Sequence, residues 1–131
     1  MKTIMVAWMI ALGLSQPPDL VVVEKKASSV GFYSPQGRRI GGTAVGRTPH
    51  EIVFSPDRRT LYVSDNGILW MTETGAGGNT ISIVDVATRR KTGTIDLGAN
   101  RRPHGMDVIP RTGQIVVTVE KIGRASCRER V

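Results

Sequence analysis

The sequence predicts an all-β protein, and three observations support this fold class. Short segments rich in Ile, Val, Tyr and Thr alternate with turn-forming residues, as is typical of antiparallel strands. After the first 15 residues, no segment keeps the apolar period of an amphipathic helix. A pattern of Pro-His, an apolar segment, a proline-containing turn and a second apolar segment starts at Pro49 and again at Pro103.

The first 15 residues, MKTIMVAWMIALGLS, are typical of a secretory signal peptide. Lys2 supplies the positive start, residues 4–14 are apolar, and Gly13 and Ser15 are small residues suited to a cleavage site. The apolar run is shorter than the roughly 20 residues that a membrane-spanning helix needs. We therefore expect a periplasmic or extracellular protein without a membrane span after cleavage. A buried amino-terminal strand or helix is the alternative.

The last residues, 122–131, read IGRASCRERV and continue none of the preceding patterns. The string resembles the translation of a sequencing adapter, so we expect it to be non-biological and the natural sequence to break off near Lys121. A genuine basic tail is the alternative.

The two ends change the charge and the cysteine content of the part expected to fold. The chain has 18 basic and 11 acidic residues, a net charge of +7. Four of the basic residues and Glu129 lie in the two end segments, which leaves 14 against 10 and a net charge of +4. This charge does not favour nucleic acid as a partner. Cys127, the single cysteine, lies in the tail, so the rest can form no disulfide or cysteine-ligated metal site.

The segment from Pro49 to the residue before Pro103 is one whole repeat, and it contains four predicted strands separated by residues that favour turns. They cover residues 51–54, 61–64, 81–86 and 91–97. Ser55-Pro56-Asp57 predicts a tight turn after the first, because proline presets φ and Asp accepts backbone hydrogen bonds.

An earlier, degenerate copy covers residues 20–46, and a third copy starts at Pro103. The spacing from Pro49 to Pro103 is 54 residues, longer than the roughly 40–45 of a four-stranded repeat. The excess lies in residues 67–78, GILWMTETGAGG, which we interpret as a loop insertion of the kind that often carries function.

These residues resemble the YVTN β-propeller family, also described as YncE-like. The pattern is carried by Pro49, Ser55, Pro56, Asp57, Leu61, Tyr62, Val63, Asn79, Thr80, Asp85, Thr94, Ile95 and Gly98. The resemblance implies four-stranded antiparallel blades, seven in most members, of which this chain holds about two and a half. Residues 16–121 would then be a partial propeller with blade breaks near residues 48 and 102. Arg58 departs from the pattern where the family has Gly in the turn.

Blade geometry places the Pro-His motifs, the ends of the second strands and the inserted loop on one rim. The candidate rim residues are His50, His104, Asp65, Glu120, Trp70, Arg101 and Arg102, together with Glu24 and Met71. For the histidines, a ligand-binding or general-base role competes with a packing role at the start of each blade. For the acids, the alternative is a carboxylate that accepts backbone N–H groups. Trp70 and Met71 belong either to a ligand-contact loop or to a flap over the rim.

Two basic runs, Arg38-Arg39 and Arg89-Arg90-Lys91, are expected at turns on the opposite face, where we interpret them as solvated charges. A basic patch for an anionic partner is the alternative. The sequence contains no motif of a serine hydrolase, zinc protease, attached haem or nucleotide-binding loop.

We therefore expect a non-catalytic, exported propeller that binds a ligand or protein at the histidine-bearing rim, without cofactor or metal. One alternative is an oxidoreductase similar to the haem d1 or quinoprotein amine dehydrogenase propellers. Another is a lactonase-like propeller enzyme.

Overall fold

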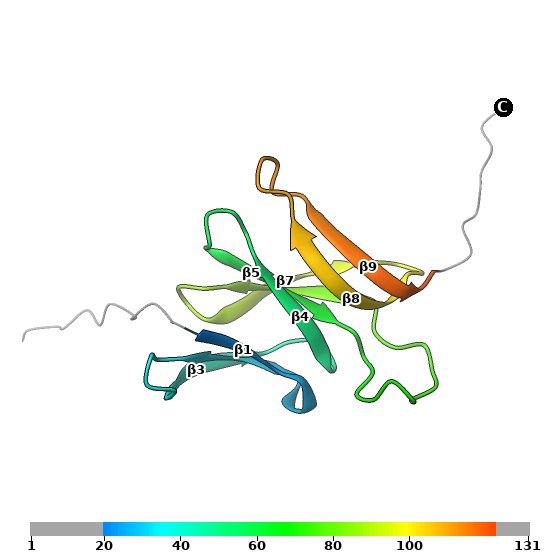
Figure 1. Ribbon diagram of the computed structural model, residues 1–131, viewed down its shortest axis with the longest axis horizontal. Coiled ribbons are helices and arrows are strands. Elements are labelled where there is room, and N and C mark those ends of the chain that lie inside the picture. The colour runs from blue at the N-terminus through cyan, green and yellow to red at the C-terminus, as the bar shows by residue number, and fades with distance from the viewer. Residues whose placement is uncertain (1–19, 123–131) are drawn as a thin grey trace, which may run out of the picture.

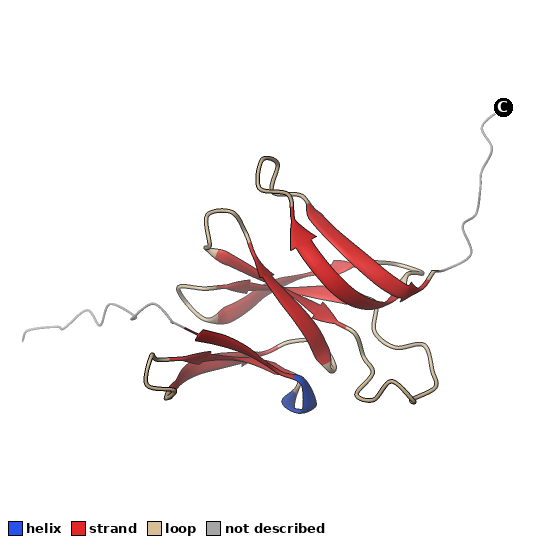
Figure 2. Cartoon of the chain, viewed as in Figure 1, coloured by secondary structure: helices blue, strands red, loops and turns tan. Residues whose placement is uncertain are grey.

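The computed structural model describes residues 20–122, which form three consecutive antiparallel sheets (Figure 1). Apart from one short 3₁₀ helix, all regular structure is strand, so the all-β prediction is confirmed (Figure 2). The first sheet contains β1 (Leu20–Glu24), β2 (Ser29–Tyr33) and β3 (Arg39–Ala44), with the 3₁₀ helix η1 (Lys25–Ala27) between the first two strands.

The second sheet has four strands in sequence order and the third has two. The second contains β4 (Pro49–Phe54), β5 (Thr60–Asp65), β6 (Thr80–Asp85) and β7 (Arg90–Asp96), and the third β8 (Arg101–Val108) and β9 (Ile115–Lys121). Each strand expected in the whole repeat overlaps its observed strand closely.

The turn between β4 and β5 keeps the shape expected of a glycine-containing turn although it contains Arg58. The Ser55 N–H donates to the Thr60 carbonyl, and the Arg58 N–H donates to the Ser55 carbonyl. Asp57 accepts from the Ser55 hydroxyl at 2.6 Å. Arg58 has φ 59°, the left-handed region that glycine adopts without steric cost. Arg58 therefore stands in place of glycine without altering the conformation of the turn.

The main core lies between the first and second sheets. Val30 and Phe32 of β2 are fully buried against Leu61 and Val63 of β5 and Val84 of β6. Alternate residues of a strand face opposite sides, so these positions share one inter-sheet layer. Burying each such side chain contributes about 1.5–3 kcal/mol, which makes this layer the main link between the two sheets.

β4 contacts β1 on one side and β8 on the other, while β3 lies against β7. Both β4 and β8 contain a β-bulge directly after their proline. In β4 the register shifts between Pro49 and Ile52, and in β8 between Pro103 and Met106. A bulge adds one unpaired residue and redirects the strand's side chains. The repeated Pro-His motif thus has the same local structure in two sheets.

The proposed signal peptide and, apart from Ile122, the proposed adapter-derived tail lie outside the described residues. Within residues 20–122, no helix is long and apolar enough to cross a membrane.

Candidate functional site

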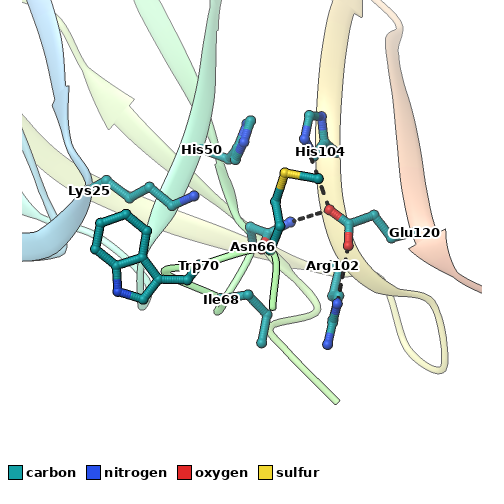
Figure 3. Close-up of a pocket in the computed structure, with 9 residues that line it drawn as sticks. Lys25, His50, Asn66, Ile68, Trp70, Arg102, His104 and Glu120 are labelled. Carbon is teal, nitrogen blue, oxygen red and sulfur yellow. Dashed lines mark hydrogen bonds and ion pairs between the residues drawn. The ribbon is translucent and has the colours of Figure 1, made fainter. Parts of the chain in front are cut away.

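A cavity of about 140 Å³ lies where the bulges of β4 and β8 meet the inserted loop (Figure 3). Three sheets contribute to it, because η1 belongs to the first, β4 to the second and β8 and β9 to the third. The lining residues are Lys25, His50, Asn66, Ile68, Trp70, Met71, Arg102, His104 and Glu120.

The two histidines, 54 positions apart in sequence, stack on each other. Their ring centroids are 3.8 Å apart and the planes are inclined by 39°. The Nδ1 atom of His50 is buried and has no hydrogen-bond partner among the described residues, whereas the His104 side chain is half-exposed. Burial lowers the pKa of His50, and the positive charges that His104 and Lys25 can carry lower it further. His50 is therefore held as the neutral imidazole near pH 7.

Glu120 of β9 joins Arg102 and His104 of its own sheet to Asn66, which follows β5 of the second sheet. Its carboxylate accepts from the Arg102 guanidinium at 3.3 Å and from the Asn66 amide at 3.2 Å, and it lies 3.9 Å from His104 Nε2. The Asn66 amide also donates to the Pro103 carbonyl at 3.2 Å. Because Asn66 is buried, these bonds hold one wall of the cavity in a defined position.

Arg102 holds the inserted loop against the third sheet. Its guanidinium donates to the carbonyls of Glu73, at 3.1 Å, and Gly75, at 2.9 Å, in addition to its bond with Glu120. Lys121 donates to the same Gly75 carbonyl at 2.7 Å. The loop is therefore attached at its centre.

The tip of this loop exposes two large apolar side chains beside the cavity. Trp70 is 67% exposed and Met71 is 99% exposed. The backbone N–H of Trp70 donates to the Glu73 carboxylate at 3.1 Å, and this bond fixes the turn that presents the two side chains. In this arrangement they form an open edge of the cavity.

Three predicted rim residues, Arg101, Asp65 and Glu24, do not line the cavity. Arg101 pairs with Lys121 in the sheet and is absent from the lining. Asp65 is only 1% exposed and faces the segment that follows the first sheet. It accepts from the Gly46 N–H at 2.9 Å and from the hydroxyls of Thr80 and Ser82 at 2.8 Å each. Burial raises its pKa, and the two hydroxyl bonds oppose that rise.

Glu24, the corresponding acid of the first sheet, also lies away from the cavity. It accepts hydrogen bonds from the Arg39 guanidinium at 3.0 Å, the Tyr33 hydroxyl at 2.8 Å and the Ser29 hydroxyl. The bond from Arg39, together with those from Ser29 and Tyr33, lowers the pKa of Glu24 to about 2. Its interactions stabilise the outer face of the sheet.

The interpretation of the basic residues as solvated charges is wrong for Arg89, which is partly buried, whereas Arg39 forms an ion pair and remains exposed. Arg39 pairs with Glu24, and Arg89 donates to the Ile40 carbonyl of the first sheet at 2.8 Å. A long side chain reaches across several residues, so a position in a turn does not decide where its charge lies.

Three lining residues were not anticipated from the sequence. Lys25 reaches the cavity from a 3₁₀ turn that no periodic pattern reveals, while Asn66 lies directly before the inserted loop and Ile68 lies within it. The only available signal was the position of Asn66 and Ile68 within or beside that long insertion.

The described residues contain no cluster of three or more His, Cys, Asp or Glu side chains suited to a metal ion. A tetrapyrrole does not fit this cavity either. Pockets for drug-sized ligands measure about 300–1,000 Å³, against about 140 Å³ here. His50 and His104 also stack on one another instead of facing an open ring-sized space.

Two solved structures are similar to the chain. Hydrazine synthase from Kuenenia stuttgartiensis matches with a TM-score of 0.65 and 25% identity, over 79% of this chain and 27% of that protein. Dihydro-heme d1 dehydrogenase NirN, in complex with DHE, matches with a TM-score of 0.58 and 17% identity, over 76% and 19%. Both are β-propeller proteins. The described residues have the fold of part of a β-propeller.

The chain thus spans about a quarter or less of these two proteins. No protein-family model matches the sequence, and a search of curated proteins finds no match.

Proposed function

We propose that this propeller segment is a binding module that takes a small ligand in the cavity between the two Pro-His bulges. The observation that carries the proposal is the convergence of His50 and His104, from equivalent positions of successive repeats, on one cavity. Ligand sites in proteins combine a concave surface with a few fixed polar groups and an apolar lining, and this cavity has each of these.

The fixed polar groups support a binding role. The Asn66 amide donates one hydrogen bond to Glu120, and Arg102 is held by three acceptors. Side chains that are already ordered lose little conformational freedom when a ligand arrives. The unpartnered Nδ1 of His50 shows that packing alone does not satisfy this ring.

The test is a screen of small polar metabolites by NMR, with the imidazole signals of the chain as the readout. The sequence contains two histidines, so each signal can be assigned with one variant. Binding at the cavity is expected to shift both signals in the wild type and in the distant control Arg111→Ala. A screen in which no compound shifts either signal would contradict the proposal.

A second candidate function is that of a haem-type propeller oxidoreductase, which the similarity to the NirN dehydrogenase favours. The described cavity does not enclose a tetrapyrrole, so such a group would need further blades. Adding haem to the chain and recording its absorption spectrum tests this candidate. A saturable change in the haem band that His50→Ala and His104→Ala abolish would support it, and an unchanged spectrum would contradict a role of these two histidines as haem ligands.

We also propose that the protein is exported and that its repeats are of the YVTN type. The apolar stretch at residues 4–14 and the recurrence of Pro-His at two equivalent bulges support these two points. Mass spectrometry of protein expressed with residues 1–15 tests export. A mature chain starting at Gln16 is expected, and an intact Met1 in all fractions would contradict it.

A further inference from the structure

We propose that the ligand of the cavity is a small carboxylate with an apolar body. Its carboxylate would lie beside Lys25, and its body would lie against Ile68, Trp70 and Met71. This inference rests on the proposed function, that the cavity binds a ligand, and adds the chemical class.

The charge of the cavity favours a monoanion. Among the lining residues, the positive charge of Arg102 is matched by Glu120. Within residues 20–122, Lys25 forms no ion pair, so its ammonium group is the one lining cation without a counter-charge. Figure 3 shows the Lys25 side chain extended toward the space near His50 and Asn66. A carboxylate placed there would supply the missing counter-charge.

The Glu120 carboxylate disfavours ligands with higher negative charge. It lines the same cavity as Lys25, and like charges repel more strongly when water is partly excluded. A doubly charged phosphate would be attracted by the Lys25 ammonium group and repelled by the Glu120 carboxylate. A singly charged carboxylate would pair with the same ammonium group and be repelled less by Glu120.

The lining also has an apolar part, which favours a ligand that carries an apolar body. Ile68 is buried at 6% exposure, whereas Trp70 and Met71 are exposed at the edge of the cavity. Covering apolar surface contributes roughly 25 cal/mol per Å². An aliphatic body laid across these three side chains would remove such surface from water.

The size of the cavity limits the length of that body. A volume of about 140 Å³ corresponds to roughly four or five water molecules at ~30 Å³ each. A short-chain acid such as butanoate suits this volume better than a fatty acid or a drug-sized molecule.

Trp70 provides a direct readout of binding. The chain has two tryptophans, Trp8 and Trp70, so in a Trp8→Phe background the emission reports on the cavity edge alone. We would titrate this protein with butanoate, butanamide and butylammonium, which share a body and differ in charge. Butanoate is expected to change the emission saturably, with an affinity at least tenfold higher than that of either analogue.

Lys25→Met and Lys26→Met form a matched pair of variants. Lys26 is the exposed neighbour of Lys25 in η1 and does not line the cavity. Lys25→Met is expected to reduce butanoate affinity to that of butanamide, and Lys26→Met is expected to leave it unchanged. Circular dichroism checks that both variants remain folded.

Equal affinities for butanoate and butanamide, or an unchanged affinity in Lys25→Met, would overturn the inference. If other compounds in the NMR screen shift the histidine signals while butanoate does not bind, only the chemical class is wrong. If neither butanoate nor any screened compound has an effect, the proposed function fails with it.

Discussion

The backbone N–H of Gly46 donates to the Asp65 carboxylate over 2.9 Å, and this bond joins the segment after the first sheet to the end of β5. Asp65 is buried, and its other oxygen accepts from Thr80 and Ser82. A residue that the sequence suggested for a binding rim therefore acts as a connection between successive sheets. The close approach needs glycine, because a Cβ at position 46 would collide with the Asp65 side chain.

Gly46→Ala is expected to destabilise the protein by about 1–3 kcal/mol, because the added methyl group must displace Asp65 from a packed position. Urea unfolding followed by circular dichroism measures the change. Gly93→Ala is the control, since a Cβ there would meet no atom closer than 3.4 Å, which is an ordinary contact. Equal stability of Gly46→Ala and the wild type would show that the contact does not exist in solution.

Phe32→Ala is expected to cost about 3–5 kcal/mol, because it opens a cavity in the layer between the first and second sheets. The same urea experiment measures it. Leu20→Ala, at a side chain that is 53% exposed, is expected to cost much less. Similar losses in both variants would mean that the two sheets do not pack as described.

Arg102→Ala is expected to release the inserted loop, because the guanidinium holds the carbonyls of Glu73 and Gly75. Limited proteolysis within residues 67–78 should become faster, since cleavage requires a segment that opens locally. Arg101→Ala is the control, because this neighbour lines no part of the cavity. Unchanged cleavage rates in Arg102→Ala would argue against the attachment.

The fold was predictable because its repeat is local in sequence. Strands 61–64 and 81–86 were found from β-branched residues between turns, and both match observed strands closely. The bulge after Pro49 was not predictable, since a one-residue register shift leaves no periodic signal. It is nevertheless the feature that directs His50 toward His104.

The site was only partly predictable, because burial of charged groups depends on contacts between distant segments. The pairing of the two Pro-His motifs on one rim was anticipated from their repetition, and both histidines line the cavity. Lys25 was missed, since a lysine after a strand is ordinarily solvated. Asp65 was placed on the rim, because the sequence does not show that Gly46 approaches it.

The stability of the protein is expected to fall as the pH drops below 6.5, in part through His50. Its pKa in the folded state lies below the ordinary value of 6.5, because of burial and then the charges of His104 and Lys25, while Glu51 and Glu120 act in the opposite sense. Below pH 6.5 the unfolded chain therefore binds a proton that folded His50 does not, and this favours unfolding. His50→Asn removes this contribution.

The corresponding measurement compares urea unfolding of the wild type and His50→Asn at about pH 7.5 and 5.5. The free energy of unfolding should decrease more steeply with acid in the wild type than in the variant. Identical pH dependence in both proteins would indicate that His50 is not shielded from water.

The most direct test of the account is a nuclear Overhauser measurement between the two imidazole rings. Ring centroids 3.8 Å apart place protons of His50 and His104 close enough for a strong cross-peak, and the sequence has no other histidine to confuse it. The account predicts this cross-peak, lost in His104→Ala. Its absence from a folded sample, in which each histidine still shows contacts within its own sheet, would contradict the convergence of the two repeats on one cavity.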